Sequence, residues 1–240
     1  MKQKCFLVVA PHPDDAELGM GGTMLLLKER GYRVIIVDLT SGEPTPFGNE
    51  EKRKRETEEA SSVLGIEERL NLDLPNRYLF DTKDARLLLA EKIRLMQPDA
   101  LFSPLSEDAH PDHIAANALS IGARFYAKYT KLSLEGDPWY TGRLFHYSCS
   151  HLRAMPGHLR DMPRYSFLVD TSSHFERKIE AARCYRSQFI DNPKNSAVFD
   201  YVRTRDRYFG SLIGTAYAEP FYSSEALSVT DPSVFLQDVS

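Results

Sequence analysis

The sequence lacks the features that mark disulfide-stabilised, membrane-spanning and nucleic-acid-binding proteins. Its three cysteines, Cys5, Cys149 and Cys184, are widely spaced and odd in number, so neither a disulfide framework nor a cysteine-based zinc motif is expected. No stretch approaches the ~20 apolar residues that cross a bilayer, and the apolar run before Pro11 is too short for a signal peptide. The net charge of −4 gives no electrostatic reason to expect an anionic partner. We therefore expect a cytoplasmic protein without nucleic-acid partners and without membrane insertion.

The composition is that of a globular protein, with 42% apolar and 27% charged residues. A chain of 240 residues can bury a large core, and no linker, internal repeat or low-complexity tract divides it. We predict a single domain over residues 1–240. Strand–helix repeats with the metal motifs occupy residues 1–127, and residues 128–240 form a less regular portion of the same domain.

Hydrophobic patterning predicts alternating strands and helices. Apolar runs rich in β-branched residues indicate strands at 5–10, 33–39, 69–74 and 100–104. Helical spacing and stop signals such as Gly31, Gly65 and Pro98 indicate helices at 24–30, 50–64, 84–96 and 111–126. Two further strands, at 143–148 and 166–169, and two helices, at 175–189 and 198–212, are expected. The pattern predicts an α/β fold with a mostly parallel sheet and helices on both faces.

Two short polar motifs follow predicted strands. One lies within Pro11–Gly19, after the first strand, and the other is His110–His113, after the strand at 100–104. Open α/β sheets place ligands at the carboxyl ends of their strands. If the motifs meet there, His12, Asp15 and His113 form a metal site of two imidazoles and one carboxylate, with an open position for water. Zinc favours this set, and ligand type leaves iron and manganese open.

The remaining motif residues supply roles for metal-assisted hydrolysis of an amide or ester. Asp14 is placed to take a proton from metal-bound water, whose pKa the ion lowers. His110, with Asp112 close enough to orient or charge it, is placed to stabilise a developing oxyanion or to protonate a leaving amine.

Other interpretations of single residues stay open. A histidine at a strand end is often a packing or capping residue, and Asp14 or Asp15 alone is a candidate helix cap. Gly19, Gly21 and Gly22 suggest dinucleotide binding, but their spacing does not fit Gly-x-Gly-x-x-Gly, and carboxylates in the preceding loop would repel a pyrophosphate. We expect these glycines to allow close packing of a helix on a strand.

The stretch Pro11–Thr23, taken together with His110–His113, resembles the motifs of the LmbE-like, or PIG-L, family of zinc-dependent de-N-acetylases. The resemblance covers nearly the whole chain. Further matching positions are Thr40–Glu43, Arg53 with Glu56 and Ala60, and Leu64-Gly65. The segments Tyr185–Phe189 and Tyr217–Phe221 look most like the branch that makes bacillithiol.

The resemblance implies a Rossmann-like three-layer fold and removal of acetate from an N-acetylglucosamine (GlcNAc) conjugate. It implies one Zn²⁺ per chain on His12, Asp15 and His113, although Fe²⁺ would suit the same ligands. Asp14 becomes the general base, and His110, supported by Asp112, becomes the partner of the tetrahedral intermediate. Family members often form trimers or hexamers, so a homo-oligomer is expected.

The resemblance also implies substrate contacts. Arg53 matches a family arginine that contacts sugar hydroxyls or a substrate acid, Arg143 is a candidate for a similar task, and Glu43 lies in a candidate site loop. Asn76 stands where relatives commonly have an aspartate, so this contact carries no charge and the aglycone stays open. Lys128–Trp139 and His151–Arg164 look longer than in the bacillithiol branch, and they either shape a pocket rim or decorate the surface. The alternatives are an amidase acting on a larger thiol or sugar conjugate, and a non-catalytic sugar-binding protein.

Overall fold

The computed structural model describes residues 3–149 and 165–228 of the chain. Strands and helices alternate from residue 5 to residue 147, and three helices follow one another between residues 175 and 212. The strands are β1 (Cys5–Ala10), β2 (Arg33–Thr40), β3 (Glu68–Leu74), β4 (Ala100–Pro104), β5 (Arg143–Tyr147), β6 (Phe167–Asp170) and β7 (Ala218–Tyr222). The helices are α1 (Asp15–Glu29), α2 (Glu50–Leu64), α3 (Lys83–Met96), α4 (Pro111–Ala127), α5 (Phe175–Arg183), α6 (Arg186–Phe189) and α7 (Val198–Leu212), with a 3₁₀ turn at Pro193–Asn195. Within these ranges no helix combines the length and apolar character needed to span a membrane.

The strands form one seven-stranded sheet in the order β3-β2-β1-β4-β5-β7-β6. Neighbours from β3 to β5 pair in parallel, which confirms the predicted mostly parallel sheet. β7 pairs antiparallel with both β5 and β6. We did not predict β7 as a strand, because Glu219 and Pro220 interrupt its apolar pattern, yet all five of its residues are buried.

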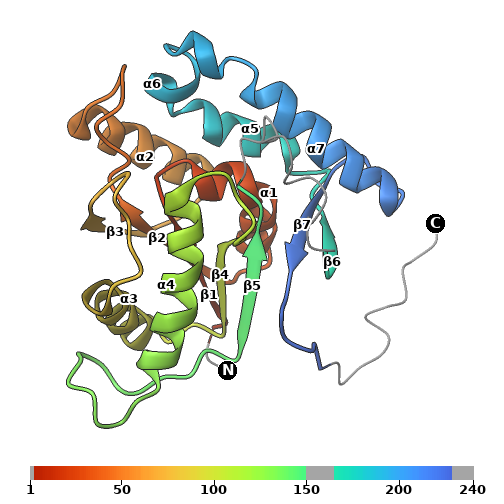
Figure 1. Cartoon of the computed structure of the whole chain (residues 1–240). Coiled ribbons are helices and arrows are strands. Elements are labelled where there is room, and N and C mark those ends of the chain that lie inside the picture. The colour runs from red at the N-terminus through yellow and green to blue at the C-terminus, as the bar shows by residue number, and fades with distance from the viewer. Residues whose placement is uncertain (1–2, 150–164, 229–240) are drawn as a thin grey trace.

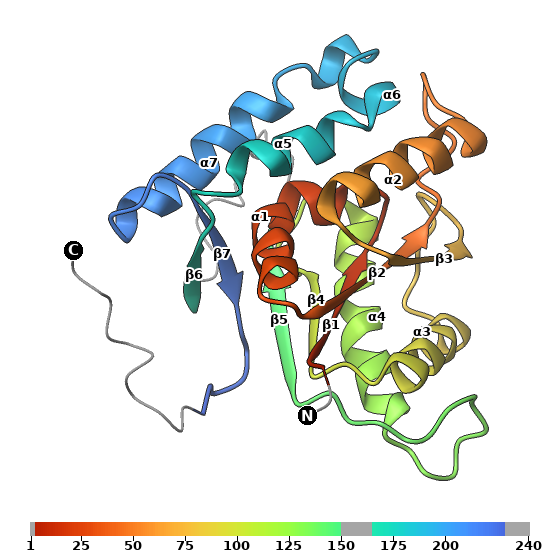
Figure 2. The same cartoon turned by 180° about the vertical axis from the view of Figure 1, so that it is seen from behind.

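Alternate side chains of the central strands enter two separate cores. In β1, Leu7 and Val9 pack with residues of α3 and α4, whereas Val8 and Ala10 face α1. Successive strand residues point to opposite faces of a sheet, so a strand that is apolar at every position is buried on both sides. Figure 1 shows α4 in front of the sheet, and α1 lies in front of it in the reverse view of Figure 2. The predicted three-layer α/β fold is confirmed.

Helices α5, α6 and α7 form an additional group along the top of the molecule, next to α1 and α2 (Figures 1 and 2). Their apolar side chains, among them Phe175, Ile179 and Tyr185, form a third cluster that includes Leu18 of α1. The helix predicted over 175–189 is wrong in one respect, because it breaks between α5 and α6. Tyr185 leaves the helical region with a ψ of 63°, while the apolar spacing continues across the break and gives no signal of it.

Helix α1 begins directly at Asp15, earlier than the spacing predicted, and kinks at Met20. Glycines on both sides of the kink face other elements closely. A Cβ atom added to Gly19 would lie 2.4 Å from Cδ2 of Tyr147 in β5, and one added to Gly22 would lie 2.6 Å from Cβ of Thr171. The glycines therefore serve close packing, as predicted.

The two polar motifs leave the sheet at adjacent positions. β1 pairs with β2 on one side and with β4 on the other, so the connections from β1 and from β4 diverge to opposite faces of the sheet. Such a switch in direction opens a crevice at the carboxyl ends of the strands. Residues 11–14 and 105–110 border this crevice.

Candidate active site

The loop after β1 is held in a strained turn. Thr40, the last residue of β2, donates from its backbone N (3.2 Å) and from its Oγ1 (3.0 Å) to the carbonyl oxygen of Pro11. Asp14 has a φ of 122°, a region that side chains other than glycine rarely occupy. Strained backbone of this kind clusters at functional sites, where it fixes the direction of a side chain. The turn brings the side chains of His12, Asp14 and Asp15 to the carboxyl edge of the sheet.

The three predicted metal ligands converge. Donor atoms of His12, Asp15 and His113 all lie within 4.8 Å of one another, and all three residues are buried. Nδ1 of His12 lies 2.9 Å from Oδ2 of Asp15, and Nε2 of His113 lies 3.3 Å from Oδ1 of Asp15. Oδ1 of Asp15 is fully buried and faces the charge of His113. A buried carboxylate with two imidazole nitrogens around it fits a divalent cation, and two imidazoles and one carboxylate suit zinc.

Each histidine of this set has a carboxylate at its other ring nitrogen. Nε2 of His12 lies 3.0 Å from Oδ2 of Asp112, and Nδ1 of His113 lies 2.9 Å from Oδ2 of Asp108. Carboxylates in this position fix the tautomer and the orientation of metal-binding imidazoles. Asp108 was missed in the sequence, where its one signal is a place in the loop before His110. Sγ of Cys149 also lies 3.2 Å from Nδ1 of His113.

The carboxylate of Asp112 contacts His12, and its charge acts on His110 without a direct contact. We expected its carboxylate to orient His110, but that carboxylate contacts His12 and accepts hydrogen bonds from the backbone N of Arg77 (2.7 Å) and Leu79 (3.2 Å). The contact between Asp112 and His110 runs the other way, because Nδ1 of His110 accepts a hydrogen bond from the backbone N of Asp112 at 3.2 Å. His110 is therefore the N-cap of α4. Spacing alone could not reveal this pairing, since it depends on the loop at 75–79.

The buried charges of this cluster shift the pKa values of its members. Burial lowers the pKa of His12, but its hydrogen bonds with Asp112 and Asp15 outweigh burial and raise that pKa to about 9. Burial likewise lowers the pKa of His113, yet the charge of Asp15 raises it well above its usual value. Burial favours a neutral Asp15, but the charge of His113 holds the pKa of that carboxyl well below its usual range. Since metal ligation requires neutral imidazoles, an ion bound here would release protons from this cluster.

Asp14 and Arg53 form a buried pair beside the ligands. Nη1 of Arg53 donates to Oδ2 of Asp14 and to the carbonyl oxygen of Pro13, both at 3.0 Å. Burial raises the pKa of Asp14 to about 7, and the charge of Arg53 opposes that rise. A carboxyl group with a pKa near the working pH is well matched to general-base chemistry.

His110 is neutral near pH 7. Its ring stacks on His113 at a centroid distance of 4.8 Å and meets His12 edge-on at 4.9 Å. Burial and the charges of these two imidazoles lower the pKa of His110 to about 4. Because Nδ1 accepts from the backbone of Asp112, the ring proton is assigned to Nε2. His110 can thus donate a hydrogen bond to an oxyanion from Nε2.

The predicted substrate-binding residues are not all at this edge. Arg53 and Glu43 are buried beside Asp14, with Nε of Arg53 3.4 Å from Oε1 of Glu43, and partly buried Asn76 lies in the turn next to Arg77. Arg143, in contrast, opens β5 opposite Ala100, the first residue of β4. This position is at the amino end of the strands, so the structure does not bring Arg143 to the site. Its guanidinium instead donates to Oγ of Ser228 at 2.6 Å.

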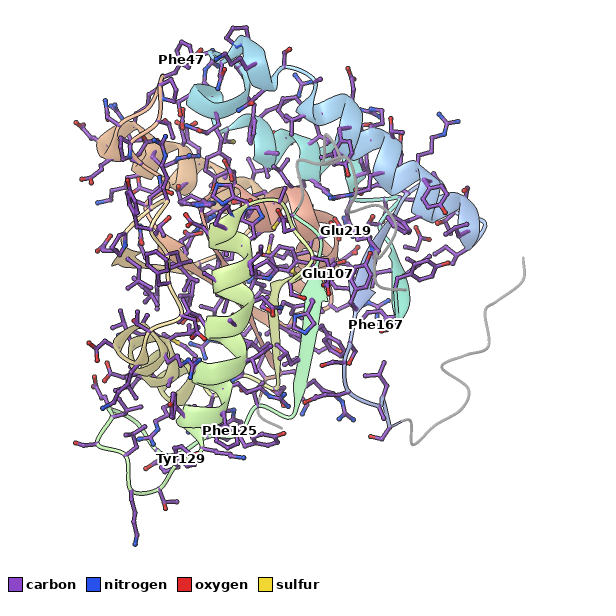
Figure 3. The ribbon with its side chains drawn as sticks, viewed as in Figure 1. Phe47, Glu107, Phe125, Tyr129, Phe167 and Glu219 are labelled. Carbon is purple, nitrogen blue, oxygen red and sulfur yellow. The ribbon has the colours of Figure 1, made fainter. Side chains whose placement is uncertain are left out.

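The segment Lys128–Trp139 also lies away from the site. It follows the carboxyl end of α4, and Nε1 of Trp139 donates to the carbonyl oxygen of Pro98, just before β4. Figure 3 shows Phe125 and Tyr129 at this lower end of α4, whereas His113 is in the first turn. Of the two predicted roles, surface decoration is the one this position fits. His151–Arg164 lies outside the described residues.

This fold and this cluster of histidines and carboxylates define the chain as a member of a known class. A family model described as "GlcNAc-PI de-N-acetylase" (PIG-L) matches residues 7–123, which contain both polar motifs. The chain belongs to this family, as its motifs indicated.

Individual relatives cover most of the chain. The crystal structure of the conserved protein TT1542 from Thermus thermophilus superposes with a TM-score of 0.83 and 40% identity, over 94% of this chain and 97% of that one. The diacetylchitobiose deacetylase of Thermococcus kodakarensis is 28% identical, covering 90% of this chain and 81% of that protein. The structure of N,N′-diacetylchitobiose deacetylase from Pyrococcus horikoshii has a TM-score of 0.78 and 27% identity, over 92% and 83% of the two chains. The two deacetylases among these relatives support a hydrolytic de-N-acetylase.

Proposed function

We propose that the protein is a zinc-dependent hydrolase that removes acetate from a GlcNAc conjugate. One observation carries the proposal: donor atoms of His12, Asp15 and His113 all lie within 4.8 Å of one another, and a separate buried carboxyl, Asp14, stands beside them. His12, Asp15 and His113 hold the ion. When bound, the ion polarises the amide carbonyl and lowers the pKa of a water molecule.

Asp14 is the proton carrier in this proposal. Its carboxylate accepts a proton from the attacking water as the carbon–oxygen bond forms. The same proton passes to the amide nitrogen as the carbon–nitrogen bond breaks, so that amide and water become acetate and amine. Arg53 holds the carboxylate through Oδ2, which leaves Oδ1 for the exchange.

His110 stabilises the charge that develops on the carbonyl oxygen. It donates from Nε2, because Nδ1 is occupied by the backbone of Asp112. A pre-positioned neutral donor of this kind is typically worth about 10²–10³ in kcat. Asp112 keeps His12 in place, and Asn76 offers an uncharged amide to the substrate.

The proposal also covers the assembly, the cellular location and the substrate class. We infer a homo-oligomer, a trimer or a hexamer, with one ion per chain, acting in the cytoplasm. The substrate belongs to thiol biosynthesis of the bacillithiol kind or to a sugar lipid. Supporting observations are the relatives named as GlcNAc deacetylases, which include a probable N-acetyl-α-D-glucosaminyl L-malate deacetylase of Bacillus anthracis, 30% identical over 122 residues.

The deciding experiment is an amine-release screen with zinc present. GlcNAc, N,N′-diacetylchitobiose, GlcNAc linked to malate or inositol, and S-conjugated N-acetylcysteines are offered to the purified protein. We expect turnover of one or more GlcNAc compounds and no turnover of the S-conjugates. Turnover confined to the S-conjugates would replace the proposal with the larger-amide alternative. Tight sugar binding without a bound ion or any amine release would leave only a binding protein.

Asp14→Asn tests the proton carrier. The amide oxygen of the variant still accepts the hydrogen bond from Arg53, but it cannot take a proton. We expect kcat to fall about 10²–10⁴-fold, with one ion per chain retained by elemental analysis. Asp137→Asn, at an exposed position, is the control and keeps parental turnover. Equal activity of Asp14→Asn and the parent would remove Asp14 from the mechanism.

A further inference from the structure

Three of the four residues in Tyr185–Gln188, the N-cap and the beginning of the short helix α6, are buried. Tyr185 is 0% exposed, Ser187 1% and Gln188 8%, whereas Arg186 between them is exposed. The segment follows the family match, which ends at residue 123. The polar groups of Tyr185, Ser187 and Gln188 contact elements that border the active site.

Ser187 forms hydrogen bonds with helix α2. Its backbone N and its Oγ each donate to one carboxylate oxygen of Glu56, both at 2.7 Å. Glu56 is three residues after Arg53, so the two side chains lie on neighbouring positions of one helix face. A two-point hydrogen bond to a 4% exposed carboxylate fixes this turn of α2, and with it the origin of the Arg53 side chain.

Gln188 holds the loop after β2. Its Nε2 donates to Oγ1 of Thr45 at 3.1 Å. Thr45 in turn donates from its backbone N (2.7 Å) and its Oγ1 (2.9 Å) to the carboxylate of Glu43, and Glu43 faces Nε of Arg53. Gln188 therefore reaches Arg53 through two intervening residues. Both views of the chain show α6 beside this loop (Figures 1 and 2).

Tyr185 supports the guanidinium directly. Cζ of Arg53 lies 5.6 Å from the centroid of the Tyr185 ring, within the range of a cation–π contact. The hydroxyl of Tyr185 donates to Oε1 of Glu17 at 2.8 Å, which holds the ring in its orientation. The three residues of the segment thus act on Arg53 from the helix, from the loop and from the ring face.

We propose that Tyr185, Ser187 and Gln188 are positioning residues that hold Arg53 against Asp14 and so set the position of the general base. The inference rests on the proposed function in so far as Asp14 is that base. The alternative is that the segment merely packs the α5–α7 group onto the rest of the molecule. In the positioning role, a substitution in the segment lowers kcat by displacing Arg53. In the packing role, its effect does not depend on Arg53.

A double-mutant cycle separates them. Tyr185→Leu and Gln188→Ala are each made in the parent and in Arg53→Lys, with Arg186→Ala as the matched control from the same segment. In the parent we expect kcat to fall about 10- to 100-fold, as for small displacements of catalytic groups, while KM stays within about twofold and one ion per chain is retained. In Arg53→Lys the same substitutions have little further effect, because residues that act as a unit are not additive. Tyr185→Phe keeps the ring and keeps most of the turnover.

Additive losses in the two backgrounds would overturn the proposal, and so would a parental kcat in Tyr185→Leu. A second measurement does not depend on turnover. Exchange of the Arg53 Nε proton, followed by ¹⁵N NMR, is expected to quicken several-fold in Tyr185→Leu and Gln188→Ala and to stay unchanged in Arg186→Ala. Unchanged exchange in all three would refute the positioning role. A parent with no amine release but with these exchange changes would instead contradict the proposed function alone.

Discussion

At the residue scale, the site is a set of charges in which each group controls its neighbour. Asp108 and Asp112 face the outer nitrogens of His113 and His12, and Arg53 faces Asp14. Removing one member therefore changes the properties of another residue. Two of these pairs can be tested separately.

The pH dependence of turnover reports the pair of Asp14 and Arg53. The base must be ionised, and burial raises its pKa to about 7, so kcat/KM is expected to rise with pH up to about 7 and then level. The charge of Arg53 lowers the pKa of Asp14, so Arg53→Met moves this acidic limb to higher pH. Asp137→Asn leaves the limb in place. A limb that moves to lower pH in Arg53→Met would contradict the assignment.

Asp108 is expected to set ion affinity through His113. Asp108→Ala removes the carboxylate at Nδ1, and loss of such a partner typically weakens metal binding about 10- to 100-fold. Asp108→Asn keeps an acceptor and loses less. Competition with a chelator measures the Kd, and Asp137→Ala is the control. If Cys149→Ala weakens binding and Asp108→Ala does not, the thiol is the true partner of His113.

At the element scale, the second half of the kinked helix α1 is capped by Glu219, a residue almost 200 positions further along the chain. The backbone N of Gly22 and of Thr23, just after the kink, donate to the Glu219 carboxylate at 2.9 and 2.7 Å. Glu219 also accepts from Lys178, whose Nζ lies 2.6 Å from both Glu219 and Asp206. β7 thus caps the second half of α1 through a fully buried ion network.

Glu219→Ala is expected to lower the free energy of unfolding by about 3–5 kcal/mol, because it leaves a buried lysine with one partner fewer. Urea unfolding provides the measurement. Glu176→Ala breaks an exposed pair with Arg203, and such pairs contribute about 0–1 kcal/mol. Similar losses in the two variants would show that the network around Glu219 adds nothing beyond a surface ion pair.

At the scale of the whole molecule, the proposed ion would join two connections that leave opposite sides of the switch between β1 and β4. An ion that binds the folded state but not the unfolded state raises the free energy of unfolding by about 4 kcal/mol when its free concentration is a thousand times Kd. Chelation is therefore expected to lower the melting temperature by several degrees and to abolish turnover, and added zinc restores both. Calorimetry with and without chelator checks this. The Asp15→Ala variant serves as the control, since its melting temperature should not respond to zinc; a response equal to that of the parent would place the ion elsewhere.

Much of this protein can be read from its sequence because the relevant signals are local. A strand that is apolar at every position, such as β1, must be buried on both faces, and this points to a parallel sheet with helices on each side. His12 and Asp15 are three residues apart in one turn, so their convergence needs no knowledge of the rest. Asn49 and Gly65 bound α2 as their capping chemistry predicts.

The tertiary structure alone decided the contacts between remote segments. The carboxylate of Asp112 faces His12 rather than His110 because the loop at 75–79 presents two backbone donors to it, and Arg143 lies at the far edge because of the direction of β5. Asp108, Tyr185 and Glu219 acquire their partners only once the strands take their order. Sequence spacing determines which way neighbouring side chains point, whereas hydrogen bonds and ion pairs across the sheet depend on which strands lie side by side, and no local pattern encodes that.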